Sequence, residues 1–264
     1  MKKQTFALYF GNRGFFPESL IASARNEVSE AVKAAGFDYI MPPADMTRYG
    51  AVETKDEGMV YASWLKSHEG EYDGLIMSLP NFSDENGAVA AVRDCGVPIF
   101  IQAYPDEIGK MDFDHRRDSY CGKFSICDVF HQYKIPFTIM PPHVVHPNTD
   151  AFAKNLSDFA AVCRVVNGMK RFTIGVIGAR TTKFKTVRYD EITLQKYGIT
   201  CDTYDLSELF YRVEKMDGNS AAVKAKIEKL IGYTDFSSVP KDKTETLAKV
   251  SVAIDDMMRE YHLD

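Results

Sequence analysis

Short apolar runs that alternate with amphipathic segments are the feature that most constrains the fold of this chain. The first run, residues 5–10, is followed by a segment whose apolar residues recur three or four positions apart. That spacing predicts a helix with one buried face. Repetition of the pattern predicts an α/β fold in which helices cover both faces of a parallel sheet. The expected buried face consists of Leu20, Ala24, Val28, Ala31 and Ala35.

The same alternation continues along the chain and predicts two sets of strands. Helical segments are expected around residues 59–66, 84–94 and 121–133, with further helices after residue 148. The expected strands are residues 5–10, 39–41, 74–79, 98–102, 137–140, 171–177 and 199–204.

A proline-rich segment at residues 141–148 predicts a domain boundary, because proline fixes φ and removes a backbone donor. We therefore expect two Rossmann-like parallel-sheet domains, residues 1–145 and 146–264. Asn148 or Thr149 can cap the helix that opens the second domain. That domain shows only two clear strands before three helical segments, and such sheets usually carry four or more strands. A truncated chain is favoured over a last helix that packs back onto the first domain.

Charge and cysteine usage exclude several classes of protein. The 264 residues include 32 basic and 37 acidic side chains, a net charge of −5, which argues against a nucleic-acid binder. No apolar run approaches the roughly 20 residues that cross a bilayer, and the N-terminal apolar stretch is too short for a signal peptide. The 5 cysteines show no CxxC spacing, which favours the cytoplasm.

Ligands of open parallel sheets bind outside the carboxyl ends of the strands, so the loops there are the candidate sites. In the first loop, residues 11–17, Arg13 offers several donors and Phe15 and Phe16 offer flat apolar faces, which suits a sugar. The alternative is a simple connector with Phe15 or Phe16 in the core. In the second loop Phe82 lies at the tip, and Ser83 or Asp84 caps the next helix.

Two further loops admit competing interpretations. In residues 103–122, His115 with Asp112 and Asp114 could form a metal cluster, but no further ligand has suitable spacing, and a solvated charge run is the better interpretation. Residues 175–178 read GxxG and not the GxGxxG of dinucleotide loops, which disfavours NAD. Arg180 and Lys183 could instead face a substrate.

These segments together resemble the N-terminal half of the L-fucose/L-arabinose isomerase family, and the resemblance runs along essentially the whole chain. It implies two Rossmann-like domains followed by a third, in a homo-oligomer (trimer or hexamer) whose neighbouring first domain closes over the sugar. The segments that carry it are GNRGFF at residues 11–16, residues 72–83, PIFIQ at residues 98–102 and VIGAR at residues 176–180.

The family interconverts aldoses and ketoses with a divalent ion, usually Mn²⁺. The resemblance implies that the carboxylates and histidine that hold the ion, and the acid/base groups, lie beyond the second domain. On that view this chain carries no catalytic residue and no metal ligand, and instead shapes a substrate pocket.

Six residues match substrate-contacting positions of the family. Arg13 and Phe15 fall in the first loop, Phe82 lines the pocket, and Thr181 falls near the contribution of the second domain. Asp118 and Cys121 fall near positions where the arabinose enzymes place a glutamine and a histidine. These departures leave the sugar open and count against L-arabinose.

Two other functions are considered beside the isomerase. A cytosolic, non-catalytic sugar-binding module could clamp its ligand between the two expected domains. A nucleotide-dependent oxidoreductase using the loop at residues 175–178 is the weaker third hypothesis.

Overall fold

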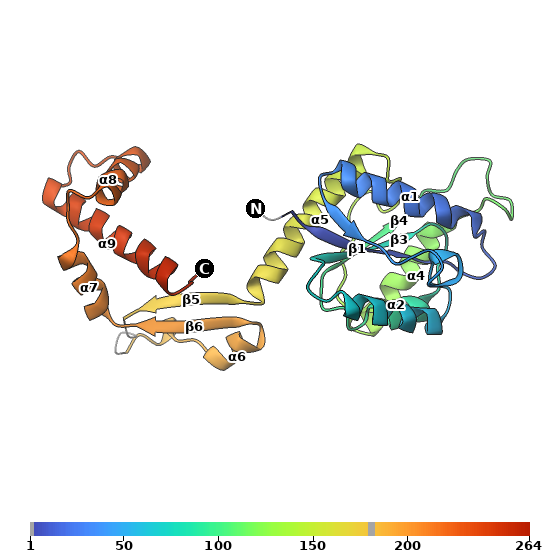
Figure 1. The fold of residues 1–264 in the computed structure, drawn as a ribbon, viewed down its shortest axis with the longest axis horizontal. Helices are drawn as coiled ribbons and strands as arrows, with labels where there is room; N and C mark the ends of the chain where they lie inside the picture. The colour runs from blue at the N-terminus through green and yellow to red at the C-terminus, as the bar shows by residue number, and fades with distance from the viewer. Residues whose placement is uncertain (1–2, 179–182) are drawn as a thin grey trace. The chain divides into compact units, whose positions relative to one another are not determined.

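The computed structural model describes residues 3–178 and 183–264, which form two compact units (Figure 1). The first unit extends to Asn167 and the second runs from Gly168 to Asp264. Both combine helices with a parallel sheet, so the fold class is α/β as predicted.

A four-stranded parallel sheet organises the first unit, in the order β2-β1-β3-β4. The central strands lie in register, with Leu8 opposite Ile76 and Ile76 opposite Phe100. The strands are β1 (Thr5–Phe10), β2 (Asp38–Ile40), β3 (Gly74–Leu79) and β4 (Ile99–Ala103).

Helices cover both faces of this sheet, because alternate side chains of each strand point to opposite faces. Phe6 and Leu8 are buried on the face covered by α1 and α5 (Figure 1). Ala7 and Tyr9 are buried on the face covered by α2, α3 and α4. The helices are α1 (Ser19–Ala34), α2 (Lys55–Ser67), α3 (Glu85–Val92), α4 (Ser119–Gln132) and α5 (Asp150–Met169), with a short 3-10 turn, η1 (Arg48–Gly50).

Two local predictions need correction. The run at 137–140 is not a full strand, since only Thr138 bridges to Phe100 of β4. Pro136 and Pro141 flank this run and limit the ladder. The buried face of α1 differs from the predicted one: Ile21 and Val32 are buried together with Ala24 and Val28. Three members of the expected face are only partly buried, namely Leu20, Ala31 and Ala35.

Helix α5 belongs to the first compact unit, which places the division about one helix later than the expected boundary between residues 145 and 146. Phe152 and Phe159 are fully buried with Phe100 of the sheet. A Cβ at Gly74 would lie 2.5 Å from the Cys163 sulfur, so only glycine permits this approach of α5 to β3. The first sheet therefore needs α5 to bury its apolar face.

The second unit contains the parallel pair β5 (Phe172–Ile177) and β6 (Ile199–Tyr204). Its long last helix packs against α7 and α8 of the same unit, through a small core that includes Leu209, Ala253 and Met257. Among the described residues, none of the helices combines the length and apolar character that a membrane span requires. The helices are α6 (Glu191–Lys196), α7 (Leu206–Lys215), α8 (Ala221–Tyr233) and α9 (Lys241–Glu260), with a 3-10 turn, η2 (Lys185–Val187).

Candidate functional site

The strand order places a topological switch point between β1 and β3. The chain leaves β1 toward α1 on one face of the sheet and leaves β3 toward α3 on the other (Figure 1). Ligands of open α/β sheets bind in the crevice that forms where such loops diverge. We call the loops at this end of the sheet the carboxyl edge, which comprises residues 11–17, 80–85 and 104–121.

Four side chains of the carboxyl edge form one stacked series, two aromatic rings between two guanidinium groups, which we call the aromatic wall (Arg13, Phe82, Phe16 and Arg116). The Arg13 guanidinium carbon lies 4.6 Å from the Phe82 ring centroid. The Phe82 and Phe16 rings are stacked with centroids 5.9 Å apart. The guanidinium of Arg116 lies 5.1 Å from the other ring, Phe16. Cation–π contacts of this kind stabilise the series and fix its order.

Two further residues adjoin the aromatic wall. Phe15 contacts Phe16 with ring centroids 5.0 Å apart and is 63% exposed, whereas Phe16 is only 5% exposed. The Asp118 carboxylate accepts a 3.1 Å hydrogen bond from Nε of Arg116. Phe16 thus fills the core position, while Phe15 presents a free apolar face to a ligand or a partner.

Arg13 is held in place by groups of the loop that follows β3. Its Nε donates to the Ser83 carbonyl oxygen at 3.0 Å, and its Nη2 pairs with Glu85 at the start of α3. The other oxygen of Glu85 accepts a hydrogen bond from the Ser125 hydroxyl at 2.5 Å. Arg13 therefore joins the loops after β1 and β3 across the switch point.

A buried amide network lies beneath the aromatic wall. The side-chain amide of Asn81 donates to the carbonyl oxygen of Asn12, whose own amide donates to the Glu53 carboxylate. All three side chains are almost completely buried. Buried polar groups require such partners, and a satisfied network fixes local geometry. The two central loops of the carboxyl edge are thus locked to each other.

The first turn of α4 approaches the loop after β3 very closely. A Cβ at Gly122 would lie 1.7 Å from the Phe82 carbonyl oxygen, so only glycine fits there. Ser83 and Asp118, on the two sides of this contact, have φ values of 70° and 46°. Left-handed backbone at non-glycine residues is strained and concentrates at functional sites. Cys121, adjacent to Gly122, is exposed at this edge.

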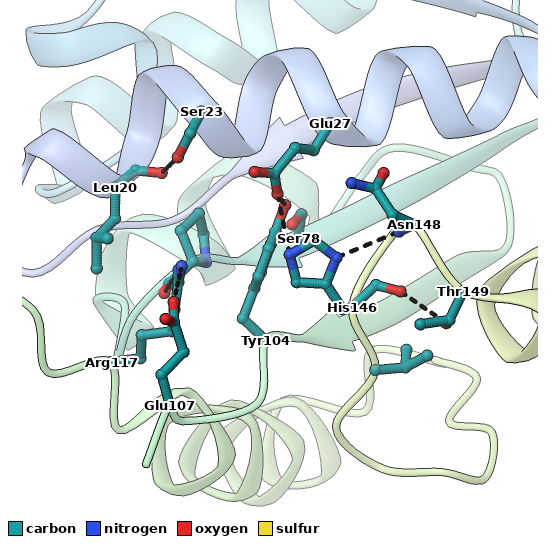
Figure 2. Close-up of polar contacts among 12 residues, drawn as sticks. Leu20, Ser23, Glu27, Ser78, Tyr104, Glu107, Arg117, His146, Asn148 and Thr149 are labelled. Carbon is teal, nitrogen blue, oxygen red and sulfur yellow. Dashed lines mark hydrogen bonds and ion pairs between the residues drawn. The ribbon is translucent and has the colours of Figure 1, made fainter. Parts of the chain in front are cut away.

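Tyr104 joins three elements just after β4 (Figure 2). Its hydroxyl donates to Glu27 of α1 at 2.8 Å, and the Arg117 guanidinium lies 4.7 Å from its ring centroid. His146 packs edge-on against the ring, with its Nε2 3.5 Å from Glu27. Burial, with Glu27 adding to the effect, raises the pKa of Tyr104 far above its usual range. The phenol therefore stays a donor and braces the edge.

Lys123 is a buried base on α4 that lies behind the carboxyl edge. Its side chain is only 4% exposed, and Nζ donates to the His143 carbonyl oxygen at 2.8 Å. Burial lowers the pKa of this amine to about 8. The contact fastens α4 to the proline-rich segment before α5.

The structure places five of the six predicted site residues at the carboxyl edge, namely Arg13, Phe15, Phe82, Asp118 and Cys121. The sixth, Thr181, lies outside the described residues, as does Arg180. Their action on a sugar stays a prediction. The site predicted from the sequence does not include Glu85, Glu53 or Arg116. Each sits in a charged or polar stretch with no periodic signal, and the first two meet their partners only through the fold.

The described residues do not fit a resident divalent ion. Over residues 3–178 and 183–264, no group of three or more His, Cys, Asp or Glu side chains could hold a metal. His115 bonds Asp112 at 2.7 Å, and both side chains are about half exposed. At the carboxyl edge, Glu85 pairs with Arg13, Asp118 pairs with Arg116, and Asp106 accepts hydrogen bonds from backbone amides.

The first unit is an open parallel α/β domain with an ordered set of aromatic, cationic and amide side chains at its carboxyl edge, the edge at which ligands of this class of domain bind. The family model for the N-terminal domain of fucose/sulfoquinovose isomerases matches residues 7–170, more than half of the chain. The chain belongs to this family of sugar isomerases. A search of curated proteins found no match. The matched range covers nearly all of the first compact unit and ends at the start of the second.

Proposed function

We propose that this protein takes part in the interconversion of an aldose and its ketose, and that this chain supplies part of the sugar pocket. One observation carries the proposal: the domain that the family model matches gathers Arg13, Phe15 and Phe82 at the edge where such sheets bind ligands. A sugar offers hydroxyls to the guanidinium and C–H faces to the aromatic rings.

The role of these residues is binding and orientation. Arg13 retains Nη1 for a ligand, since its contacts within the described chain use Nε and Nη2. The Phe82 ring is held between Arg13 and Phe16, so its edge borders the sugar and helps to exclude water. Holding a substrate in reactive geometry can lower a barrier by several kcal/mol, on the order of 7–11 in the best cases.

Isomerisation also requires a group that moves a proton between adjacent carbons and an electrophile that stabilises charge on oxygen. We assign neither role to the described residues. Mn²⁺ enters the proposal through the family resemblance alone, and no step is assigned to it, because the described residues give it no donor set.

We further propose a cytoplasmic homo-oligomer in which a neighbouring subunit covers the carboxyl edge. Exposed apolar side chains support this arrangement, because Phe15, Phe113 and Phe124 are each more than 60% exposed in the single chain. Large exposed apolar side chains are available to an association surface.

The test is ketose formation by the intact protein with a panel of aldoses that includes L-fucose, L-arabinose and sulfoquinovose, before and after treatment with a chelator. We expect the protein to convert at least one of these aldoses. We expect the chelator to abolish this activity and added Mn²⁺ to restore it. Sugar binding without turnover would instead support the non-catalytic binding module. The absence of turnover with or without Mn²⁺ would overturn the isomerase proposal.

A further inference from the structure

The three arginines of the carboxyl edge differ from an open anion site in one respect: each is already paired with a carboxylate. Arg13 pairs with Glu85 and Arg116 pairs with Asp118. The third, Arg117, lies 3.5 Å from Glu107 (Figure 2). The positive charge that a sulfonate or phosphate would need is therefore balanced within the chain.

The pair between Arg13 and Glu85 is the best fixed of the three. Both side chains are mostly buried, at 26% and 20% exposure. Glu85 is also fixed from the other side, because its second oxygen accepts a hydrogen bond from Ser125. A ligand that approaches Arg13 thus meets a guanidinium with a carboxylate at its side.

This arrangement treats neutral and anionic sugars differently. A hydroxyl group is uncharged, so it can accept a hydrogen bond from Nη1 of Arg13, which has no hydrogen-bond partner among the described residues, without repulsion by Glu85. A sulfonate bound to Arg13 would lose part of its hydration, which costs free energy. It would also lie close to the Glu85 carboxylate, and two negative charges in close contact repel each other strongly when water is excluded. The Asp106 carboxylate, which accepts from the backbone amides of Arg117 and Asp118, adds negative charge at the same edge.

We propose that Glu85 is a specificity-determining residue that neutralises Arg13 and restricts the pocket to uncharged aldoses, in preference to sulfonated ones. The inference rests on the proposed function, because it assumes that Arg13 faces the sugar. It separates the two sugars that the family description names: this chain is fitted to a fucose-like substrate and not to sulfoquinovose.

The experiment compares L-fucose and sulfoquinovose with the intact protein, by calorimetric binding and by kcat/KM. The unaltered protein is expected to prefer the neutral sugar at least tenfold in both measurements. Glu85→Gln keeps an acceptor for Ser125 but removes the charge, and is expected to narrow the preference about tenfold or more, chiefly by improving binding of the sulfonated sugar. Glu71→Gln is the matched control, because Glu71 is exposed and precedes β3 at the opposite edge of the sheet. It is expected to leave the ratio unchanged.

The outcomes separate this inference from the isomerase proposal. Preferential binding of L-fucose without turnover would support the role of Glu85 while contradicting isomerisation. Equal or tighter binding of sulfoquinovose by the unaltered protein would overturn the inference, and so would binding of neither sugar. The inference would also be overturned if Glu85→Gln changed the affinity and kcat/KM for both sugars by the same factor.

Discussion

At the residue scale, Arg13 joins the loops after β1 and β3, and in the proposed function the same guanidinium donates to the sugar. The contacts to Ser83 and Glu85 consume part of its donor set and fix its direction. Stacking on Phe82 fixes the plane of the guanidinium. A side chain held in this way loses little further entropy when it binds a hydroxyl, which is the advantage of a pre-organised site.

Replacement of Arg13 by alanine is expected to lower kcat/KM for the sugar by about ten- to hundredfold, because a hydrogen bond from a charged group contributes about 1.5–3 kcal/mol. The melting temperature is expected to fall by less than about 4 °C, since partly exposed ion pairs contribute little to stability. Steady-state kinetics and thermal unfolding test both parts. Arg93→Ala, at an exposed arginine after α3, is the control. Unfolding of the Arg13 variant would show that the arginine is structural.

The lowered pKa of Lys123 should make the protein more stable as the pH rises through the range in which this amine loses its proton. Because the pKa of this amine is lowered to about 8, the unfolded chain binds the proton more tightly than the folded chain between pH 8 and the ordinary lysine value near 10.4. The free energy of unfolding should therefore rise with pH, by about 2 kcal/mol between pH 7.5 and 9.5, relative to Lys123→Met. Urea unfolding at several pH values measures this difference. Parallel pH profiles for the two proteins would contradict it.

At the residue scale, the sequence predicts a contact only where the chain places it locally. Arg13 and Phe82 could be selected because each follows an identifiable strand. Glu85 and Glu53 lie 72 and 41 positions from their partners Arg13 and Asn12, so no local pattern reveals these pairs. They depend on the parallel register of the sheet.

At the element scale, the position of α4 decides the shape of the carboxyl edge. Its first turn abuts the Phe82 backbone at Gly122. The next residue, Lys123, donates a hydrogen bond to the segment before α5 and so fixes the helix there. The Asp84 cap of α3 follows local rules and was expected, since its side chain accepts from the Gly87 amide at 2.7 Å. The close approach at Gly122 was not expected, because one glycine in a helical segment carries no signal of what packs against it.

Substitution of Gly122 by alanine is expected to destabilise the protein by about 1–3 kcal/mol, because the added Cβ overlaps the Phe82 carbonyl and α4 must shift. Sugar affinity should fall as well, since the shift displaces Phe82. Gly168→Ala in α5 is the matched control: its Cβ meets nothing within 4 Å, and alanine is the better helix former. Denaturant unfolding of both variants tests the prediction. Equal effects of the two substitutions would contradict it.

Residues 137–140, which the sequence predicts as a strand, illustrate a limit of predicting elements from sequence. The apolar residues of this segment have the right composition, yet only Thr138 pairs with the sheet. Whether such an edge segment joins a sheet depends on the flanking prolines and on its tertiary neighbours, so composition alone overestimates the ladder. The central strands β1 and β3, which are buried over almost their whole length, have by contrast the predicted bounds.

At the scale of the whole molecule, the first compact unit contains both the sheet and the helix α5 that completes its cover. The sequence indicated a break at residues 141–148, because prolines mark the end of an element. The sequence alone does not show whether the next helix, α5, packs in the first unit or in the second. That assignment depends on the buried contacts of Phe152 and Phe159, which are long-range.

A fragment of residues 1–169 is therefore expected to unfold cooperatively in denaturant. A fragment of residues 1–148 lacks α5 and loses the burial of Phe152, Leu156 and Phe159, each worth about 1.5–3 kcal/mol. This loss is comparable with the whole stability of a domain, about 5–15 kcal/mol, so the shorter fragment should not fold. Equal cooperativity of the two fragments would contradict the assignment of α5.

Sugar binding at the carboxyl edge is tested most directly by kcat/KM for the preferred sugar after Phe82→Ala, compared with Phe210→Ala. Phe82 lies between Arg13 and Phe16 in the aromatic wall, whereas Phe210 is an exposed residue of α7. We expect at least a tenfold loss of kcat/KM for Phe82→Ala and no change for Phe210→Ala. Full activity of the Phe82 variant would show that the sugar does not bind at this edge.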